Sequence, residues 1–550
     1  MEFLKSYIGK FPYLYILFKS PNFKIAKLNF KAYKLIKKHN LFNENYYLNK
    51  NENLKNLKID PLLHYIFFGY MEGKDPSPDF DSFFYVNNYY DAKMSKLNPL
   101  VHYALYDLNK RETKLDKNKI QELNSVEIDK FLNKEHDFSN TNINKRILYI
   151  THEKISNLGG TGHITLDIIN QLNKNYESYI LSSNNGLVEL WKIFNDKLEK
   201  IANWNVDIKK PAIIHDYNNK NNDNDLKNYF YNEKLRDIYF NIIHDLKIDL
   251  IHISHLINHS NDLIDISKFF NVPYILNIHD FYYFCPSIHL LNNEDNYCEI
   301  NCLNDNWNCK ISSNTKELVK QWREYSIEII NSSNLAIFPS NFSFEFYKNN
   351  FKGIDENKLK IIEPGRDFKN KSKSFTILDK FPVKILFTGH ISPHKGSLFI
   401  RQIKKLDKKN KLEFHFLGTT VPNLNKYGIN HGRYERDKID EYFKDIKPSF
   451  IGLFSTCPET YSHTLTESWN SNIPPIATNL GAFKERINKT NGGFLIDYKS
   501  PEIAYNEIIK IIEDKDKYIE ITENISKIEL KPMKEMLDEY IKIYADLIND

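Results

Sequence analysis

The most informative part of the chain is residues 458–493, PETYSHTLTESWNSNIPPIATNLGAFKERINKTNGG, which follow the apolar run FIGLFST at 450–456. That run has the pattern of a buried strand, and Ser462 is a natural N-cap for a short helix after it. A second strand is expected at 473–478, IPPIAT. This strand–helix–strand order is typical of a parallel sheet with helices packed on its faces.

The start of the expected helix has the chemistry of an anion site. The first backbone N–H groups of a helix lack partners within the helix, so they bind anions such as a diphosphate. Glu459 precedes the helix and is placed to reach the hydroxyls of a sugar, whereas Glu467, about one turn further in, is placed to bind a ribose. We therefore expect donor-binding residues along this loop: Tyr461, Ser462, His463, Thr464 and Leu465.

Glu459 and Glu467 are separated by seven residues. This spacing resembles the E-x7-E signature of family 4 glycosyltransferases, and the likeness continues through 473–478, Gly481 and the Gly492–Gly493 turn. The resemblance implies the α/β fold called GT-B, in which two doubly wound Rossmann-like domains face a cleft. It also implies a retaining transferase of the bacterial surface-polysaccharide type.

Length and composition favour a globular protein of several domains. The chain has 550 residues, which is too long for a single hydrophobic core. Of these residues 41% are hydrophobic and 14% aromatic, as in a globular protein. No apolar run approaches the roughly 20 residues that span a bilayer, and FPYLYILF at 11–18 is too short and too aromatic for a signal peptide. We expect a cytoplasmic protein with no nucleic acid partner.

The first 40 residues are strongly basic. They contain nine lysines and one glutamate, whereas the whole chain has a net charge of only +4. If residues 20–39 form a helix, it is basic and amphipathic, which suits peripheral contact with an anionic inner membrane face. The alternative is a docking helix that packs its apolar stripe on the neighbouring module and exposes its lysines.

A repeat of 38 residues follows the basic segment. The segment DPLLHY at 60–65 is echoed by NPLVHY at 98–103, and each copy predicts two short helices, the second beginning at the proline. Such repeats resemble small helical modules attached to bacterial surface-polysaccharide transferases. His64 and His102 are either metal or ligand contacts or structural histidines, and their matching places on an apolar helix favour the structural role.

Two series of apolar runs alternate with helical stretches and predict two doubly wound sheets. The first series is 145–152, 177–182, 249–254, 273–278 and 334–339, and the second is 383–390, 413–419, 450–456, 474–479 and 493–497. The expected domains are a basic segment (1–40), the repeat module (41–118), a linker (119–144), an acceptor domain (145–375), a nucleotide-sugar donor domain (376–520) and a helix that packs back on the acceptor domain (521–550).

Three further motifs fall where ligands bind in such sheets, beyond the carboxyl ends of strands. A glycine turn, Gly159-Gly160-Thr161-Gly162, allows a close approach to a phosphate or the acceptor, or is only a tight connection. His279-Asp280 ends a strand and resembles the His-Asp of the family, which implies that His279 lies near the reacting carbon.

The third motif, residues 389–396 (GHISPHKG), resembles the family's Gly-Arg-x-x-x-x-Lys-Gly turn from Gly389 to Gly396. There two cations neutralise the departing diphosphate. Lys395 matches one of them, whereas His390 stands where an arginine is usual. Either His390 acts when protonated or Arg366 takes over the contact.

Four of the five cysteines lie together with the spacing C-x12-C-x3-C-x6-C, at Cys285, Cys298, Cys302 and Cys309. Four thiolates are able to bind a structural zinc ion, and reduced buried thiols are the alternative. Disulfides are not expected in a reducing compartment.

The expected reaction moves a sugar from a nucleotide-sugar donor to a glycan or lipid-linked glycan acceptor. Catalytic roles fall on His279, Glu459 and Lys395. No cofactor is expected for catalysis, because no Asp-x-Asp follows a strand to hold a nucleotide-bound metal. The alternatives are a nucleotide-sugar epimerase and a non-catalytic glycan-binding or scaffold protein, which the departure at His390 keeps open.

Overall fold

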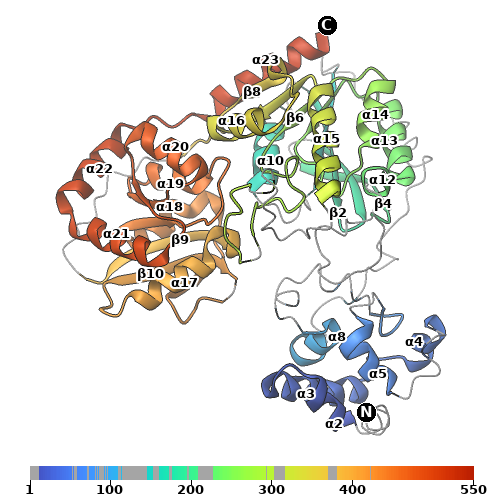
Figure 1. The fold of residues 1–550 in the computed structure, drawn as a ribbon. Coiled ribbons are helices and arrows are strands. Elements are labelled where there is room, and N and C mark those ends of the chain that lie inside the picture. Colours follow the sequence, from blue (N-terminus) through green and yellow to red (C-terminus); the bar gives the residue numbers. More distant parts are fainter. Residues whose placement is uncertain are drawn as a thin grey trace. The chain divides into compact units, whose positions relative to one another are not determined.

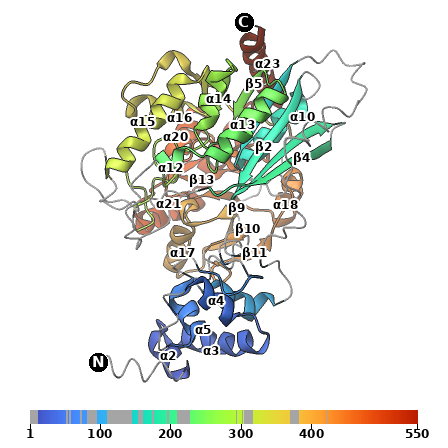
Figure 2. The same cartoon turned by 90° about the vertical axis from the view of Figure 1, so that its right-hand side faces the viewer.

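The computed structural model describes most of the chain between Pro12 and Asn549. The described residues are 12–51, 54, 59–70, 74–80, 82, 85, 92, 95, 97–108, 113, 145–152, 160–172, 176–194, 197–208, 227–292, 294–300, 302, 316–368, 381–421 and 423–549. The expected linker at 119–144 lies outside them. The chain divides into two compact units, Met1–Gln121 and Glu122–Asp550, and each is described by itself (Figures 1 and 2).

Unit 1 is helical. Its described elements are α2 (Pro12–Lys19), α3 (Phe23–Lys38), α4 (Glu44–Lys50), α5 (Pro61–His64), η2 (Tyr65–Gly69), α8 (Pro99–His102) and η3 (Tyr103–Asp107). Both expected helices at Pro61 and Pro99 are present, because Asp60 and Asn98 cap them and a proline is compatible with a first helical position. Each continues into a π-helical turn at the same place in the repeat, η2 and η3.

The helix expected at 20–39 is α3, which begins after the N-cap Asn22. Its apolar stripe, including Ala32 and Ile36, is buried in the core of unit 1, while its lysines are exposed. Helix α3 therefore adopts the docking arrangement, in which the apolar stripe packs on the neighbouring module and the lysines are exposed.

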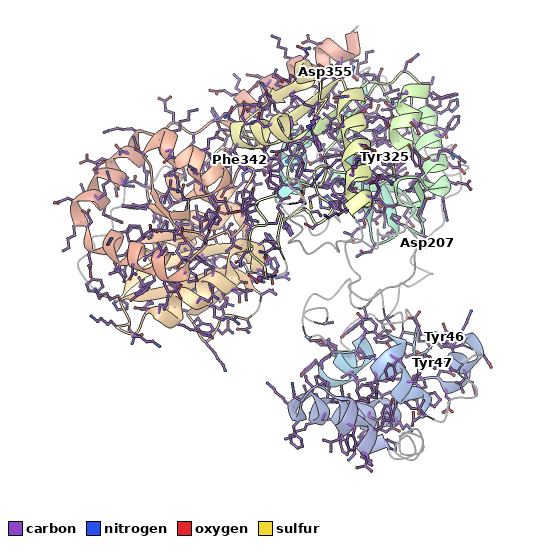
Figure 3. The ribbon with its side chains drawn as sticks, viewed as in Figure 1. Tyr46, Tyr47, Asp207, Tyr325, Phe342 and Asp355 are labelled. Atoms are coloured by element: carbon purple, nitrogen blue, oxygen red, sulfur yellow. The ribbon has the colours of Figure 1, made fainter. Side chains whose placement is uncertain are left out.

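The histidines of the two repeats have structural partners. Tyr47, labelled in Figure 3, places its hydroxyl 2.9 Å from His64 Nδ1. In the second repeat the Tyr85 hydroxyl lies 3.1 Å from His102 Nδ1. Both histidines are buried. The burial and the tyrosine partners of His64 and His102 agree with the structural role that the sequence favoured.

The first sheet of unit 2 has the strand order β4-β3-β2-β1-β5-β6-β7-β8. Its strands are β1 (Arg146–Thr151), β2 (Glu177–Asn184), β3 (Leu187–Phe194), β4 (Lys197–Asn205), β5 (Leu250–Ile253), β6 (Tyr274–Asn277), β7 (Leu335–Phe338) and β8 (Leu359–Ile361). The pairings from β2 to β8 are parallel, for example Ile147 with Ser178, but β3 and β4 pair antiparallel. The sheet is therefore mixed at one edge.

The second sheet has the order β11-β10-β9-β12-β13-β14, and each pair of neighbouring strands in it is parallel. Its strands are β9 (Val383–Ile391), β10 (Leu412–Thr420), β11 (Ile429–Gly432), β12 (Phe450–Leu453), β13 (Pro475–Thr478) and β14 (Phe494–Ile496). Every strand expected from the two apolar series is present, and the expected GT-B architecture of two doubly wound sheets is confirmed.

Helices cover both faces of the sheets. They are α10 (Gly160–Leu172), α12 (Lys227–Phe230), α13 (Glu233–Asp245), α14 (Asp262–Phe269), α15 (Lys316–Ser332), α16 (Asn341–Asn350), α17 (Ser397–Leu406), α18 (Ile439–Ile446), α19 (His463–Asn470), α20 (Gly481–Thr490), α21 (Pro501–Glu513), α22 (Lys515–Lys527) and α23 (Met533–Asn549), with short 3-10 turns η7 (Glu356–Lys358), η8 (Pro393–Lys395) and η9 (Arg436–Lys438).

Side chains alternate between two cores along the strands of the first sheet. Leu148 of β1 lies in the core that contains α13 and α15, whereas Tyr149 lies in the core that contains α10 and α23. The closing helix α23 thus packs on the first sheet, and its Tyr544 hydroxyl lies 2.5 Å from His252 Nδ1 of β5. The two sheets are linked at α16, where the N–H of Phe342 (Figure 3) donates to Glu485 of α20.

Candidate functional site

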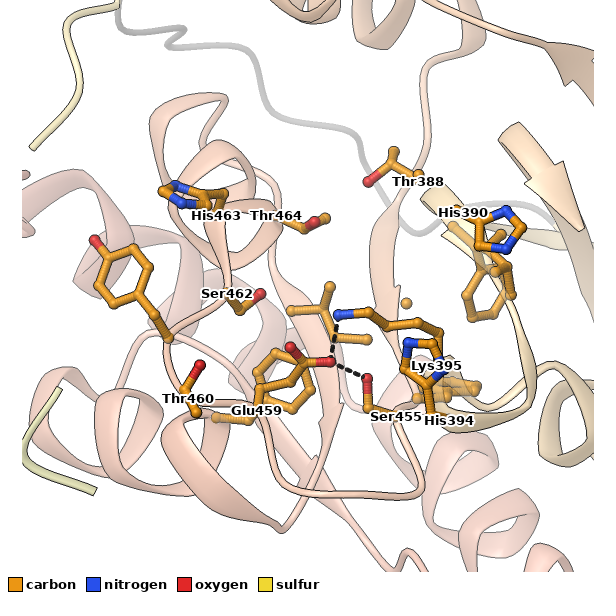
Figure 4. A pocket seen from close by; sticks show the side chains of 18 of the residues that line it. Thr388, His390, His394, Lys395, Ser455, Glu459, Thr460, Ser462, His463 and Thr464 are labelled. Carbon is orange, nitrogen blue, oxygen red and sulfur yellow. Dashed lines mark hydrogen bonds and ion pairs between the residues drawn. The ribbon is translucent and has the colours of Figure 1, made fainter. Parts of the chain in front are cut away.

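A cavity of about 430 Å³ lies in unit 2 at the carboxyl ends of strands from both sheets. The first sheet contributes His279, which follows β6, and the second contributes the ends of β9 and β12 together with the loop before α19. Figure 4 shows the polar side chains around this cavity. They are Thr388, His390, His394, Lys395, Ser455, Glu459, Thr460, Ser462, His463 and Thr464.

Lys395 is held in the cavity by the turn after β9. It ends the 3-10 turn Pro393–Lys395, and the following Gly396 has a φ of 80°. A Cβ atom at Gly396 would lie 1.8 Å from the carbonyl oxygen of Phe454, so only glycine fits this close approach. Among the described residues that line the cavity, Lys395 is the only lysine or arginine.

Lys395 and Glu459 form an ion pair in the cavity (Figure 4). The Lys395 Nζ lies 2.6 Å from Glu459 Oε1, and Ser455 donates to the same oxygen at 2.7 Å. Burial acts to raise the pKa of Glu459, but Lys395 and Ser455 outweigh it and lower this pKa below its ordinary value of 4.5. Because the folded pKa is depressed, the pair's contribution to stability is complete above pH 4.5 and is lost as the pH falls through the lower folded value.

The backbone of Glu459 is fixed by the start of α20. The N–H of Ala482 donates to the Glu459 carbonyl at 2.9 Å. Gly481 has a φ of 57°, and a Cβ atom there would lie 2.8 Å from both the nitrogen and the oxygen of Glu459. The glycine is therefore required for the close packing that positions the carboxylate.

The helix after Glu459 has the expected N-cap. Ser462 accepts a hydrogen bond from the N–H of Leu465 at 3.2 Å, with a φ of 77° that is unusual for a residue other than glycine. The N–H of Leu465 is therefore already hydrogen-bonded to the N-cap residue. The side chain of Leu465 is buried in the core. Of the residues 462–465, whose amides are the expected anion-binding groups, Ser462, His463 and Thr464 line the cavity and Leu465 does not.

Arg486 of α20 braces this loop, a role that the sequence did not reveal. Its guanidinium donates to the carbonyls of Tyr461 and Ser462 at 3.1 and 3.0 Å and lies 4.0 Å from the centre of the Tyr461 ring. Arg486 is buried, so these contacts hold the backbone that presents the start of α19. The only sequence signal for it is a charged residue at a core-facing position of a helix.

Glu467 lies beside the cavity and is paired with Arg366. The Arg366 guanidinium donates to Glu467 Oε1 and, at 3.3 Å, to the carbonyl of Arg436. Both side chains of the pair are buried. Burial raises the pKa of Glu467 despite the nearby Arg366. Arg366, considered as a substitute for the missing phosphate-binding arginine, is engaged with this carboxylate instead.

Glu467→Gln tests the ribose contact that the sequence predicts. A ribose contact is made in the ground and transition states alike, so its loss is expected to raise the KM for the donor while kcat changes little. Steady-state kinetics with varied donor measures this. Glu441→Gln, an exposed carboxylate on α18, is the control. An unchanged KM in Glu467→Gln would remove Glu467 from the donor site.

His279 lies on the side of the cavity formed by the first sheet. Its carbonyl accepts a hydrogen bond from Thr460 Oγ1 at 2.5 Å. Its Nε2 is buried, and so is Thr388 Oγ1; neither has a hydrogen-bond partner among the described residues. Burial, reinforced by His255, lowers the pKa of His279 to about 4, so its ring is neutral at pH 7. Unpartnered buried polar atoms on a cavity wall are typical of a ligand site.

His390 replaces the arginine of the resembling motif and lines the same cavity. Its Nδ1 lies 2.7 Å from Thr419 Oγ1 of β10. Burial and the charge of Lys395 lower its pKa below the ordinary value of 6.5. Without a bound anion His390 is therefore mostly neutral at pH 7, and an anion beside it would raise this pKa.

His390→Arg is expected to maintain or raise activity and to reduce the loss of activity at high pH. A histidine contributes a positive charge only below its pKa, whereas arginine stays charged throughout. The pH profiles of kcat/KM for the two proteins test this. A severe loss in His390→Arg would mean that the histidine has a role of its own.

The glycines of the expected site lie in three different situations. Gly389, in β9, lines the cavity with a φ of 97°, and no atom lies within 4 Å of a Cβ built on it. Gly160 begins α10, whereas Gly159 lies outside the described residues. Of the expected site glycines that the structure describes, Gly160 and Gly389, only Gly389 lines the cavity.

The expected zinc site is only partly described. Arg323 donates to Cys302 Sγ at 3.1 Å, and Cys285 Sγ lies 3.2 Å from Ser287 Oγ. Cys298 is buried and Cys309 lies outside the described residues. In the part of the chain that the structure describes, no three His, Cys, Asp or Glu side chains are grouped to hold a metal ion.

Residues 368–528 match the family model described as "Glycosyl transferases group 1". This segment contains the second sheet with Lys395, Glu459 and Glu467. No curated protein sequence matches the chain.

Solved structures with a similar fold are glycosyltransferases. Sucrose-phosphate synthase from Thermosynechococcus elongatus is 12% identical, with a TM-score of 0.50 over 74% of this chain and 99% of that one. A glycosyltransferase from Rickettsia africae is 17% identical, with a TM-score of 0.47 over 74% and 99% of the two chains. HepE from Anabaena, solved with UDP-glucose, is 14% identical, with a TM-score of 0.47 over 73% and 99%.

Proposed function

From the premise that this chain is a GT-B glycosyltransferase, which the family match and the two sheets support, we propose the reaction that it carries out. It moves a sugar, with retention, from a nucleoside diphosphate sugar to a hydroxyl of a growing glycan. The glycan is a capsule, a lipopolysaccharide or a similar surface polysaccharide, as in the family 4 transferases that its motifs resemble.

One observation carries this proposal: Lys395, Glu459, the start of α19 and His279 line the same cavity. The diphosphate is placed on the amides of His463 and Thr464 and on Lys395, where a preorganised charge stabilises a departing anion. Glu459 holds the hydroxyls of the donor sugar. We assign His279, from the other sheet, to the side of the reacting carbon; its buried Nε2 has no hydrogen-bond partner among the described residues.

The Lys395–Glu459 pair fits a donor that carries both a diphosphate and a sugar. In the structure each group neutralises the other. A bound diphosphate attracts Lys395, and the sugar hydroxyls donate to the Glu459 carboxylate. The site therefore offers one cation, Lys395, and one hydrogen-bond acceptor, the Glu459 carboxylate, a few ångströms apart. The phosphate and the sugar that they would bind are likewise neighbours in the donor.

Catalysis in this proposal requires no cofactor. The four-cysteine segment, Cys285, Cys298, Cys302 and Cys309, remains a proposed structural zinc site, since thiolates are the ligands that zinc favours. Metal analysis of the purified chain, with Cys302→Ser as the comparison, tests it. Loss of one equivalent of zinc in that variant supports the site, and a metal-free wild-type chain contradicts it.

Turnover of a panel of nucleotide sugars tests the proposed reaction. Slow release of the nucleoside diphosphate without acceptor is expected from a transferase, whereas a non-catalytic glycan-binding or scaffold protein releases none. An epimerase would convert the donor sugar without transferring it to an acceptor. NMR of the transferred sugar's anomeric proton tests retention, because an inverted product would contradict it.

Peripheral membrane contact is proposed for unit 1. Among the described residues no helix is long and apolar enough to cross a membrane. The apolar stripe of α3 is buried, but side chains on and after α2 are exposed, including Phe18 at 72% and Phe23 at 77%. Exposed lysines of α3 lie on the same segment of chain. Exposed aromatic side chains beside lysines suit the surface of an anionic bilayer.

Replacing Phe18 and Phe23 together with serine is expected to weaken co-sedimentation of the full chain with anionic liposomes. Truncation before residue 41 is less informative, because it would also remove the core residues of α3. Phe269→Ser is the matched control, since Phe269 is 70% exposed in unit 2. Binding that is absent, or unaffected by the double substitution and by salt, would contradict membrane contact.

A further inference from the structure

The second repeat of unit 1 contains a buried carboxylate that the first repeat lacks. Asp107 ends the π-helical turn η3, and the matching position 38 residues earlier is Gly69, at the end of η2. The two repeats otherwise share the Tyr–His pair of their cores. The difference therefore lies in one position of a common framework.

In the first repeat no side chain fits at this position. A Cβ atom at Gly69 would lie 2.0 Å from the Tyr47 hydroxyl. The neighbouring aromatic ring of Phe68 is only partly exposed, and Lys19 of α2 lies 5.3 Å from its centre. This copy of the repeat is filled by its own side chains.

In the second repeat the same place is polar. The Tyr85 hydroxyl donates to Asp107 Oδ2, and His102 Nδ1 lies 3.2 Å from that oxygen. Asp107 is only 5% exposed and His102 only 4%. The adjoining Tyr106, which matches Phe68, is 51% exposed, and its ring centre lies 5.1 Å from that of His102.

His102, Tyr106 and Asp107 line a cavity of about 670 Å³ within unit 1. The start of α3 also lines it, with the polar residues Asn22 and Lys24 and the apolar Ile25 and Leu28. Ser95 and Leu97 complete the lining. The cavity thus combines an aromatic ring, a carboxylate, an amide and a hydroxyl.

We propose that this cavity binds a sugar residue of a glycan. A pyranose ring has an apolar face of C–H groups, which stacks on an exposed aromatic ring such as Tyr106, and an edge of hydroxyls. A carboxylate accepts up to about four hydrogen bonds, so Asp107 is able to serve both Tyr85 and a sugar hydroxyl. The choice of a glycan among hydroxyl-rich ligands rests on the proposed function, whose acceptor is a glycan.

The full-length chain is tested by saturation-transfer difference NMR with maltotetraose, cellotetraose and chitotetraose. At least one tetrasaccharide is expected to bind, and Tyr106→Ala is expected to weaken it about tenfold. Asp107→Gly, which installs the first repeat's residue, should weaken it similarly. Phe68→Ala alters the matching position of the first repeat and should leave binding unchanged.

Binding that is equal in the wild type and Tyr106→Ala would place the sugar elsewhere and overturn the proposal. The absence of binding for all three tetrasaccharides would also overturn it. Thermal unfolding of each variant identifies any loss of fold. Donor hydrolysis by the same proteins separates the two proposals. Tetrasaccharide binding that Tyr106→Ala weakens, without any donor hydrolysis, would contradict the proposed transfer but support this cavity.

Discussion

Lys395→Ala is expected to lower kcat by about 10²–10³-fold, the usual cost of removing one preorganised group that stabilises a developing negative charge. Lys395 is the only lysine or arginine among the described residues that line the cavity, so no neighbouring side chain of this kind replaces it there. The buried pair of Arg366 with Glu467 does not line the cavity. Steady-state rates of nucleoside diphosphate release measure the effect.

Lys405→Ala is the matched control, because Lys405 is an exposed lysine on α17, shortly after the turn that carries Lys395. Its rate should equal that of the wild type. A Lys395→Ala variant that keeps wild-type kcat would show that the diphosphate leaves from another place.

Glu459→Gln is expected to reduce kcat far more than it reduces nucleotide affinity. The glutamine keeps the size of the side chain but loses the charge that pairs with Lys395 at 2.6 Å. In the proposed function this charge also accepts hydrogen bonds from the donor sugar. Kinetics together with the dissociation constant of a nucleoside diphosphate distinguish the two effects. Equal losses in kcat and in nucleotide affinity would place Glu459 at the nucleotide instead of the sugar.

The double variant Lys395→Ala/Glu459→Gln separates direct from indirect effects. Lys395→Ala alone leaves the mostly buried Glu459 carboxylate without its counter-ion. If Lys395 served only to neutralise that carboxylate, the double variant would have the same kcat as Glu459→Gln alone. Our account predicts a lower kcat for the double variant than for Glu459→Gln, because the lysine acts on the diphosphate itself.

The sequence predicted the two sheets because their parallel strands are buried on both faces and appear as continuous apolar runs. Strands β3 and β4 were not predicted. Their sequences, LVELWKIF and KLEKIANWN, mix charged and apolar residues, as expected for strands with a partly solvated face. The edge strands β8 and β11 were missed because their residues, LKI and INHG, are exposed or half-buried and form no continuous apolar run.

The local parts of the site were predictable, whereas its long-range partners were not. The N-cap of α19 follows from Ser462 and its neighbours alone. The pairs Arg366–Glu467 and Lys395–Glu459 join residues 101 and 64 positions apart, so they depend on how the elements pack. The one signal for Arg486, a charged residue at a core-facing position of a helix, is weak, because a lone arginine on a helix is usually exposed to solvent.

The two repeats show the same limit. Their shared prolines and histidines were evident from the sequence, and the structural role of the histidines followed from their matching positions. The exchange of Gly69 for Asp107 gained meaning only when the structure placed Asp107 beside Tyr106 on a cavity wall.

The most direct test of the central claim is a thermal-shift measurement of the full chain with a panel of nucleoside diphosphates and nucleotide sugars. A donor at 100 times its dissociation constant should add about 2.7 kcal/mol to the free energy of unfolding. We predict that at least one of these ligands raises the unfolding temperature of the wild type and has a smaller effect on Lys395→Ala. The account is contradicted if none of them does so, or if the shift is the same in both proteins.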